Sequence, residues 1–286
     1  GYPISVVYTQ PPQKSNRGYK INKSPVQNIA ETLNIEFRSP NTLQDNEEEY
    51  HYLKQMNADL AIVVAYGQLI PKKFLGLTKK GYVNIHGSIL PKWRGAAPIQ
   101  RSIMNLDNET GISIMKIAEE LDSGPVSNVY KIKINPEQNA QEISEILSTL
   151  AAEKILDNVD DILEDKAKFA DQDHSKATYA KKINKNEGQI NWNEDASNLI
   201  GKINGLFPYP GAFFNFDGER YKVLKAQIGN GIGKVGEVIS DNLEIACSNN
   251  QSIKVLEIQR QGKKPQKINE FMLGSKIKKG SKILNV

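Results

Sequence analysis

The chain has 286 residues, enough for two domains, and 39% of them are hydrophobic, which is enough to form a packed core. A single cysteine, Cys247, excludes an internal disulfide framework and a cysteine-based zinc site, and it fits a cytoplasmic location in a reducing cytosol. No stretch approaches the length and apolarity of a membrane span, so we expect no membrane-spanning segment.

The charge is unevenly distributed along the chain, although the net value is only +4. Residues 176–286 carry 18 Lys or Arg and 10 Asp or Glu, whereas the rest of the chain is slightly acidic. A basic half indicates a polyanionic partner, either a nucleic acid or a membrane surface. A solubilising lysine surface explains the same pattern, and charge alone favours this plainer interpretation.

Strands and helices alternate in the sequence up to residue 165. The first apolar strand begins almost at residue 1, and we therefore expect that a strand and a helix of the fold are missing before it. The predicted elements are, in order, strand 4–8, helix 24–34, strand 35–37, helix 46–56, strands 60–65 and 82–86, helix 97–104, strands 111–117 and 126–134, and helix 139–165. This alternation predicts an α/β domain with a Rossmann-like open parallel sheet over residues 1–165.

The character of the sequence changes after residue 165. Residues 166–185 are polar and irregular, and we expect a linker there. Beyond it we predict a helix at 196–205 and short strands at 212–216, 221–227, 236–239, 243–246 and 253–259. Asp217-Gly218 predicts a tight hairpin between the first two of these strands. Residues 186–286 are therefore expected to form a small β-barrel domain of the OB type.

The polar residues with the strongest chemical interest lie at strand ends. Asn84 and His86 are two apart on a predicted strand, so they share a face, and Asp122 lies in a turn after a later strand. Because carboxyl ends of parallel strands meet at one edge of a sheet, we expect these residues to share a cleft. Asparagine can donate to an oxyanion, histidine can move a proton, and aspartate can orient the histidine.

Several other kinds of active site are absent from the sequence. It has no GxSxG nucleophile motif, no His or Asp cluster with metal-ligand spacing, and no Walker or Rossmann glycine pattern. Asn, His and Asp without a nucleophile suit direct group transfer through a tetrahedral intermediate, with no metal. A hydrogen-bonded strand end also accounts for an isolated Asn-x-His, and by spacing alone that plainer interpretation is favoured.

Longer motifs favour a catalytic role for Asn84 and His86 over a plain hydrogen-bonded strand end. The segments NIHGSILPKWRGAAPI (84–99) and GISIMKIAEELDSGPV (111–126) closely resemble the signature of the 10-formyltetrahydrofolate-dependent formyltransferases. Within that family, RGAAPI resembles the members that act on methionyl-tRNA. Three further segments resemble other parts of the same family, namely YTQPPQKSNRGYKINKSPV (8–26), ATYAKKINKNEGQINW (177–192) and IQRQGKKPQKINEFMLG (258–274). The resemblance therefore covers nearly the whole chain.

The resemblance implies roles for particular residues. Asn84, His86 and Asp122 match the family's catalytic residues. A folate-contacting segment corresponds to Ser88, Ile89, Leu90 and Pro91, with isoleucine at the second position where the family has leucine. Arg17 matches a basic residue in the loop that engages the acceptor end of the tRNA.

The resemblance also implies the reaction. The formyl group of 10-formyltetrahydrofolate would pass to the α-amine of methionine on initiator methionyl-tRNA, without a metal, and would support translation initiation. The basic β-barrel would lie along the tRNA backbone, and we expect a monomer with no membrane partner. Two alternatives stay open. One is formylation of another acceptor, such as a nucleotide-sugar amine, glycinamide ribonucleotide or water. The other is an inactive RNA-binding protein.

Overall fold

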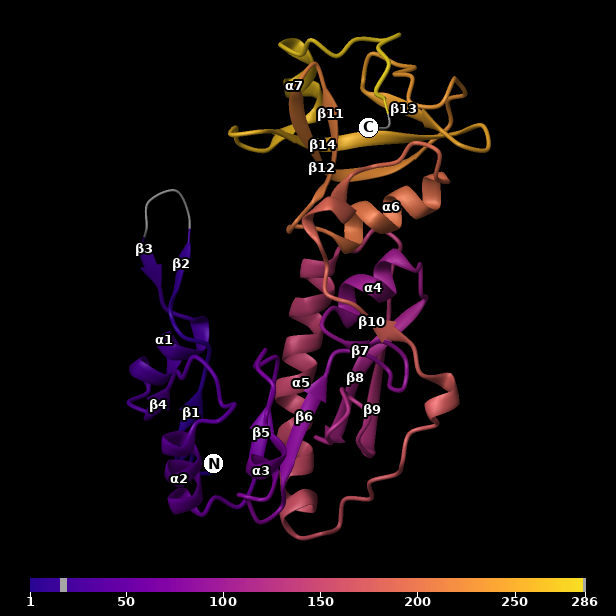
Figure 1. Cartoon of the computed structure of the whole chain (residues 1–286). Coiled ribbons are helices and arrows are strands. Elements are labelled where there is room, and N and C mark those ends of the chain that lie inside the picture. Colours follow the sequence, from indigo (N-terminus) through magenta and orange to yellow (C-terminus); the bar gives the residue numbers. More distant parts are fainter. Residues whose placement is uncertain (16–19, 285–286) are drawn as a thin grey trace. The chain divides into compact units, whose positions relative to one another are not determined.

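The computed structural model describes residues 1–15 and 20–284, which belong to two compact units (Figure 1). Arg17 lies outside the described residues. The first unit consists of Gly1–His86, Ile112–Val129 and Ala151–Ala177, and the second consists of Gly87–Gly111, Tyr130–Leu150 and Thr178–Val286. Three elements run through both units, namely β8 (Glu109–Lys116), β9 (Val126–Lys133) and α5 (Ala140–Leu163).

The first unit begins with the elements drawn from indigo to purple in Figure 1. They are β1 (Val7–Tyr8), β2 (Gln13–Ser15), β3 (Lys20–Asn22), α1 (Pro25–Thr32), β4 (Phe37–Arg38), α2 (Glu47–Met56), β5 (Ala61–Val63), α3 (Lys72–Leu75) and β6 (Tyr82–His86). Helix α1 begins as the sequence predicts, because the Ser24 side chain accepts a hydrogen bond from the Gln27 amide at 3.0 Å and Pro25 occupies the first turn. A short 3₁₀ helix at His174–Lys176 closes this unit.

Strand pairing confirms the α/β class and its parallel pairs. Strands β1 and β4 pair in parallel, as do β5 and β6. The larger sheet has the order β5-β6-β8-β9, in which β8 joins β6 antiparallel. In that register Ser113 faces His86, and Lys116 faces Val83. Strand β8 therefore ends at the opposite end of β6 from His86.

The second unit contains β7 (Arg94–Gly95), α4 (Pro98–Met104), β10 (Tyr179–Ala180), a 3₁₀ helix at Lys185–Gly188 and α6 (Ala196–Gly205). Its remaining elements, orange to yellow in Figure 1, are β11 (Ala212–Phe216), β12 (Glu219–Gly229), β13 (Glu244–Cys247), β14 (Gln251–Arg260), β15 (Gln266–Lys267) and α7 (Ile268–Leu273). The antiparallel order β11-β12-β14-β13, with β15 on β14, forms a curled half-barrel sheet.

Two local predictions for this sheet have different outcomes. Asp217 and Gly218 form a two-residue hairpin with φ of 51° and 74°, as predicted. The strand predicted at 236–239 is wrong, because this segment forms isolated bridges instead, from Glu237 to Lys282 and from Val238 to Ile245. Gly236 has a φ of 78°, which interrupts an extended strand.

An apolar core holds the half-barrel together. Trp192, Phe214 and Tyr221 are almost fully buried, and the rings of Phe214 and Tyr221 stack with centroids 5.5 Å apart. Strands β12 and β14 add buried Val223, Val255 and other aliphatic side chains to the same cluster. Among the described residues, no helix is long and apolar enough to cross a membrane.

A buried ion pair in the first unit leads to a testable pH dependence. Burial raises the pKa of Glu49, but hydrogen bonds from Arg38 at 2.7 and 2.8 Å and from Tyr8 at 2.6 Å outweigh it, leaving the pKa below its ordinary value of 4.5. A depressed carboxyl pKa stabilises the fold above the unfolded value, and this contribution is lost as pH falls through the folded value.

We therefore expect Glu49→Gln to lower the free energy of unfolding by about 2 kcal/mol at pH 7, because it removes the charge of a buried carboxylate that accepts hydrogen bonds from Arg38 and Tyr8. Urea denaturation at pH 7 and at successively lower pH measures this. The substituted chain should lose less stability on acidification than the parent. Equal acid sensitivity of both chains would contradict the assignment.

Candidate functional site

Strand β6 places Asn84 and His86 on one face. The side chains of a strand alternate, so Val83 and Ile85 lie on the other face, where both are buried. Asn84 is half-buried and His86 is 6% exposed. Ser113 of the neighbouring strand β8 is also buried and lies opposite His86. The predicted pair thus stands near the carboxyl end of β6, within the sheet of the first unit.

Asp122 joins this pair in space. Its carboxylate oxygen Oδ2 lies 3.6 Å from Nδ1 of His86, and the two side chains are only 15% and 7% exposed. A carboxylate at this distance can orient the imidazole and balance positive charge that develops on it. The structure therefore brings the three residues of the predicted catalytic set to one part of the first unit.

The route by which Asp122 reaches His86 differs from the expected one. Because β8 is antiparallel to β6, the carboxyl ends of these strands do not meet. The connector 117–125 between β8 and β9 starts beside Tyr82, where the Ile117 amide donates to the Tyr82 carbonyl at 2.9 Å. It must then fold back towards the other end of β6. Asp122 accordingly has a left-handed backbone with a φ of 48°.

The segment predicted to contact folate, Ser88 to Pro91, belongs to the second unit. Ser88 is fully buried and its hydroxyl donates to the Lys92 carbonyl at 2.6 Å, while the Lys92 amide donates to the Ile89 carbonyl at 3.1 Å. Leu90 is buried, and Ile89 and Pro91 are half-buried. The segment is thus a tight turn with two partly accessible apolar side chains.

Strand β10 fixes the loop that follows. The Arg94 amide donates to the Thr178 carbonyl and the Ala96 amide to the Ala180 carbonyl, both at 2.9 Å. A Cβ on Gly95 would lie 2.8 Å from the Ala180 carbonyl oxygen, and its φ is 117°, so glycine is required. The RGAAPI and ATYA segments are therefore neighbours, and the residues joined by these hydrogen bonds lie 84 positions apart in the sequence. Sequence reasoning missed this pairing.

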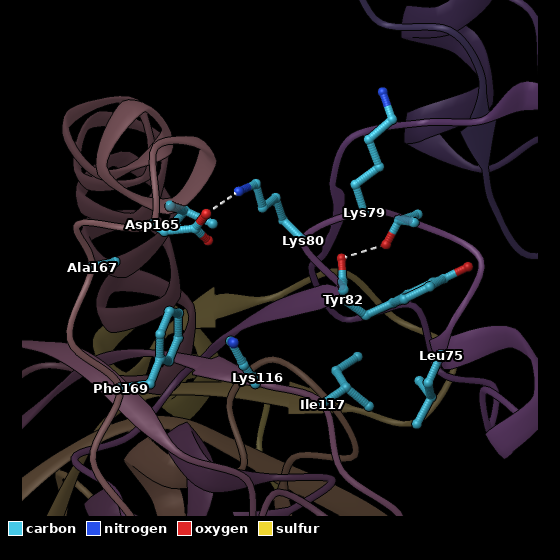
Figure 2. A pocket seen from close by; sticks show the side chains of 12 residues that line it. Leu75, Lys79, Lys80, Tyr82, Lys116, Ile117, Asp165, Ala167 and Phe169 are labelled. Atoms are coloured by element: carbon cyan, nitrogen blue, oxygen red, sulfur yellow. Dashed lines mark hydrogen bonds and ion pairs between the residues drawn. The ribbon is translucent and has the colours of Figure 1, made fainter.

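A cavity of about 420 Å³ lies elsewhere in the first unit, at the amino end of β6 (Figure 2). None of the predicted site residues lines it. Lys80 pairs with Asp165, and Lys79 pairs with Asp59 at 2.8 Å, so much of the lysine charge is balanced. The Lys116 ammonium lies 4.8 Å from the centroid of the Phe169 ring, also visible in Figure 2.

A second cavity, of about 430 Å³, lies in the second unit and is basic. Its lining includes Lys181, Lys182 and Tyr179, a residue that is 60% exposed. Arg101 also lines it and binds Glu187 through two hydrogen bonds, of 2.6 and 3.1 Å. An exposed aromatic ring beside lysine ammonium groups suits a nucleic acid, by stacking and phosphate contacts. In the part of the chain that the structure describes, no three His, Cys, Asp or Glu side chains are grouped as a metal site.

Comparisons with known proteins agree over nearly the whole chain. Residues 3–159 match the family model described as formyl transferase, and residues 182–276 match the formyl transferase C-terminal domain. A methionyl-tRNA formyltransferase of Pelagibacter ubique (strain HTCC1062) is 65% identical over 285 residues, which cover 100% of this chain and 92% of that protein. One from Chelativorans sp. (strain BNC1) is 39% identical, with coverages of 99% and 92%.

Solved structures show the same fold at low identity. HypX from Aquifex aeolicus, in complex with tetrahydrofolic acid, is 17% identical with a TM-score of 0.65, covering 94% of this chain and 47% of that one. WlaRD, a sugar 3N-formyl transferase crystallised with dTDP and 5-N-formyl-THF, is 17% identical with a TM-score of 0.66, covering 92% and 100%.

Proposed function

Because the chain belongs to the formyl transferase family, we propose that it transfers the formyl group of 10-formyltetrahydrofolate to the α-amine of methionine on initiator methionyl-tRNA. The observation that carries this proposal is the 65% identity to the Pelagibacter methionyl-tRNA formyltransferase over the full chain. The placement of Asp122 beside His86 supports a working catalytic set.

The first chemical step is attack of the neutral α-amine on the formyl carbon. A carbon–nitrogen bond forms, and the formyl oxygen becomes an oxyanion. The Asn84 amide donates a hydrogen bond to that oxyanion, and the protonated imidazole of His86 donates another. Both side chains come from one face of β6, so a rigid strand holds the two donors at fixed separation.

The second step breaks the bond between the formyl carbon and N10 of the folate. The attacking nitrogen loses a proton, and N10 gains one as it leaves, so the proton count balances. Asp122 accepts the amine proton directly or through water and, through His86, returns a proton to N10. The short distance between the Asp122 carboxylate and the His86 ring supports this path.

We also propose which parts of the chain bind the folate and which bind the tRNA. We assign the catalytic domain to residues 1–165, the linker to 166–185 and the tRNA-binding domain to 186–286. Ser88, Ile89, Leu90 and Pro91 contact the folate, and the half-buried Ile89 and Pro91 provide apolar surface for a flat ring. We also infer a monomer, and a cytoplasmic location, where charged tRNA is found.

Several features of the second unit support binding of tRNA. The basic cavity beside Tyr179 is one. Another is a set of exposed lysine side chains on the half-barrel, namely Lys225, Lys263, Lys264, Lys267, Lys278 and Lys279. Ammonium groups of this kind contact phosphates and orient a nucleic acid without reading its sequence.

A formylation assay with competing acceptors tests the reaction. The chain is incubated with 10-formyltetrahydrofolate and, in separate reactions, initiator methionyl-tRNA, an amino-sugar nucleotide, glycinamide ribonucleotide or no acceptor. We expect N-formylmethionyl-tRNA and only background tetrahydrofolate release in the other reactions. Preferred formylation of another amine, or equal release without an acceptor, would reject the proposal.

Salt dependence tests the role of the lysines. Between about 50 and 200 mM salt, we expect the affinity for initiator tRNA to fall at least tenfold, because counterion release drives phosphate contacts. Affinity for a tetrahydrofolate derivative should change little. Fluorescence titrations of both ligands measure this, and the same salt slope for both would contradict the assignment.

A further inference from the structure

Gln172 is a buried polar side chain in a segment that is otherwise mostly exposed. It is 8% exposed, whereas its neighbours Asp171 and Asp173 are exposed. Its side-chain amide nitrogen Nε2 donates to two carbonyl oxygens, those of Asp122 and Gly124, both at 2.8 Å. A single NH₂ group thus bonds two carbonyls of the turn that carries the proposed catalytic carboxylate.

That turn has an uncommon backbone. Asp122 adopts a left-handed conformation, which costs a non-glycine residue roughly 1 kcal/mol or more and persists only when its surroundings impose it. The connector also folds back from the end of β8 rather than continuing it. Hydrogen bonds to two carbonyls on either side of Ser123 supply an external constraint on this conformation.

The segment that carries Gln172 is itself anchored to the same strands. Ala170 exchanges two backbone hydrogen bonds with Val126 at the start of β9, both at 2.9 Å. The Phe169 ring lies under the Lys116 ammonium at the end of β8 (Figure 2). These two contacts fix the segment before Gln172 against β8 and β9. They therefore place the Gln172 side chain within hydrogen-bonding distance of the connector between these two strands.

We propose that Gln172 is a positioning residue that holds the Asp122 turn so that the carboxylate lies beside His86. This inference rests on the proposed function, in which Asp122 moves a proton. Bonding both carbonyl oxygens requires a side-chain amide that has the length of glutamine. A carboxylate offers no N–H donor and would face two carbonyl oxygens, and asparagine is one methylene too short to span both acceptors.

The main test uses Gln172→Met, which keeps the length and fills the buried space but removes the donors. We expect kcat for formylation to fall about 10- to 100-fold, because a displacement of the order of 1 Å at a catalytic group has this effect. KM for both substrates should stay near the parent value. Gln141→Met is the matched control, since Gln141 is exposed on α5 and its side-chain amide donates to the Glu145 carboxylate at 3.0 Å. This variant should retain parent activity.

Two further measurements separate positioning from general destabilisation. Hydrogen exchange followed by mass spectrometry should accelerate in the connector 117–125 of Gln172→Met, with the half-barrel strands unchanged. In an Asp122→Asn background, adding Gln172→Met should cause little further loss of kcat, because both changes remove the same function. Losses that multiply, or exchange that accelerates throughout the chain, would overturn the inference.

The failure of the two proposals can be told apart. If Asp122→Asn retains parent activity, the role of Asp122 in the proposed function is wrong. If Asp122→Asn is impaired but Gln172→Met matches the parent in kcat and in exchange of the connector, the proposed function stands and the inference about Gln172 is wrong.

Discussion

Replacing His86 with alanine should lower kcat for formylation by roughly two to four orders of magnitude. The imidazole is proposed both to donate to the oxyanion and to return a proton to N10, so one substitution removes two contributions. His86 is 6% exposed on a strand, and its neighbours Val83 and Ile85 pack on the opposite face. Rates of N-formylmethionyl-tRNA formation at saturating folate and tRNA measure the change.

The control for this substitution is His51→Ala. His51 is exposed on helix α2 and has no role in the proposed reaction, so the variant should keep parent activity. Circular dichroism and thermal unfolding check that both variants remain folded. A folded His86→Ala chain with parent turnover would show that the imidazole takes no part in the reaction.

Replacing Gly124 with alanine should disable the site by moving its backbone. A Cβ at this position would lie 2.0 Å from the Lys116 carbonyl oxygen and 3.0 Å from the Lys116 carbonyl carbon. Neither partner is the end of a flexible side chain, so the connector itself must shift. We expect kcat to fall about 100-fold, because Asp122 shifts with the turn, and the free energy of unfolding to fall by about 1–3 kcal/mol.

Gly76→Ala is the matched control for Gly124→Ala. Gly76 ends helix α3 in the same unit with a φ of −92°, and a Cβ there meets nothing within 4 Å. It should leave both activity and stability near the parent values. Urea denaturation and the formylation assay test the two variants side by side. Parent-like behaviour of Gly124→Ala would contradict the tight packing of the connector against β8.

Local chemistry in the sequence was enough to predict several elements. Ser24 and Pro25 mark the start of α1 because a hydroxyl cap and a fixed proline φ act within one turn. Asp217 and Gly218 mark a hairpin because left-handed dihedrals suit these residues. The alternation in β6 placed Asn84 and His86 on one face for a similar reason, since the strand period is a property of the local chain.

Contacts distant in sequence had no comparable local signal. The sequence predicts a parallel sheet, whereas β8 pairs antiparallel with β6, and this pairing depends on how the whole sheet closes. The pairing of β10 with the Arg94–Gly95 strand is a second example, because backbone hydrogen bonds do not specify which strand supplies them. Composition predicts a linker at 166–185, and nothing in it indicates that Gln172 is buried and bonds the Asp122 turn.

The residues of the proposed site could thus be predicted from the sequence, because motif spacing and side-chain chemistry are properties of the sequence itself. How these residues come together in space could not be predicted, because the carboxylate of Asp122 reaches His86 through a connector that folds back. Its path depends on the antiparallel register of β8 and on donors from residue 172, some 50 positions away. Tertiary packing alone sets such a path, since it arises from pairings between segments that have no sequence relation to each other.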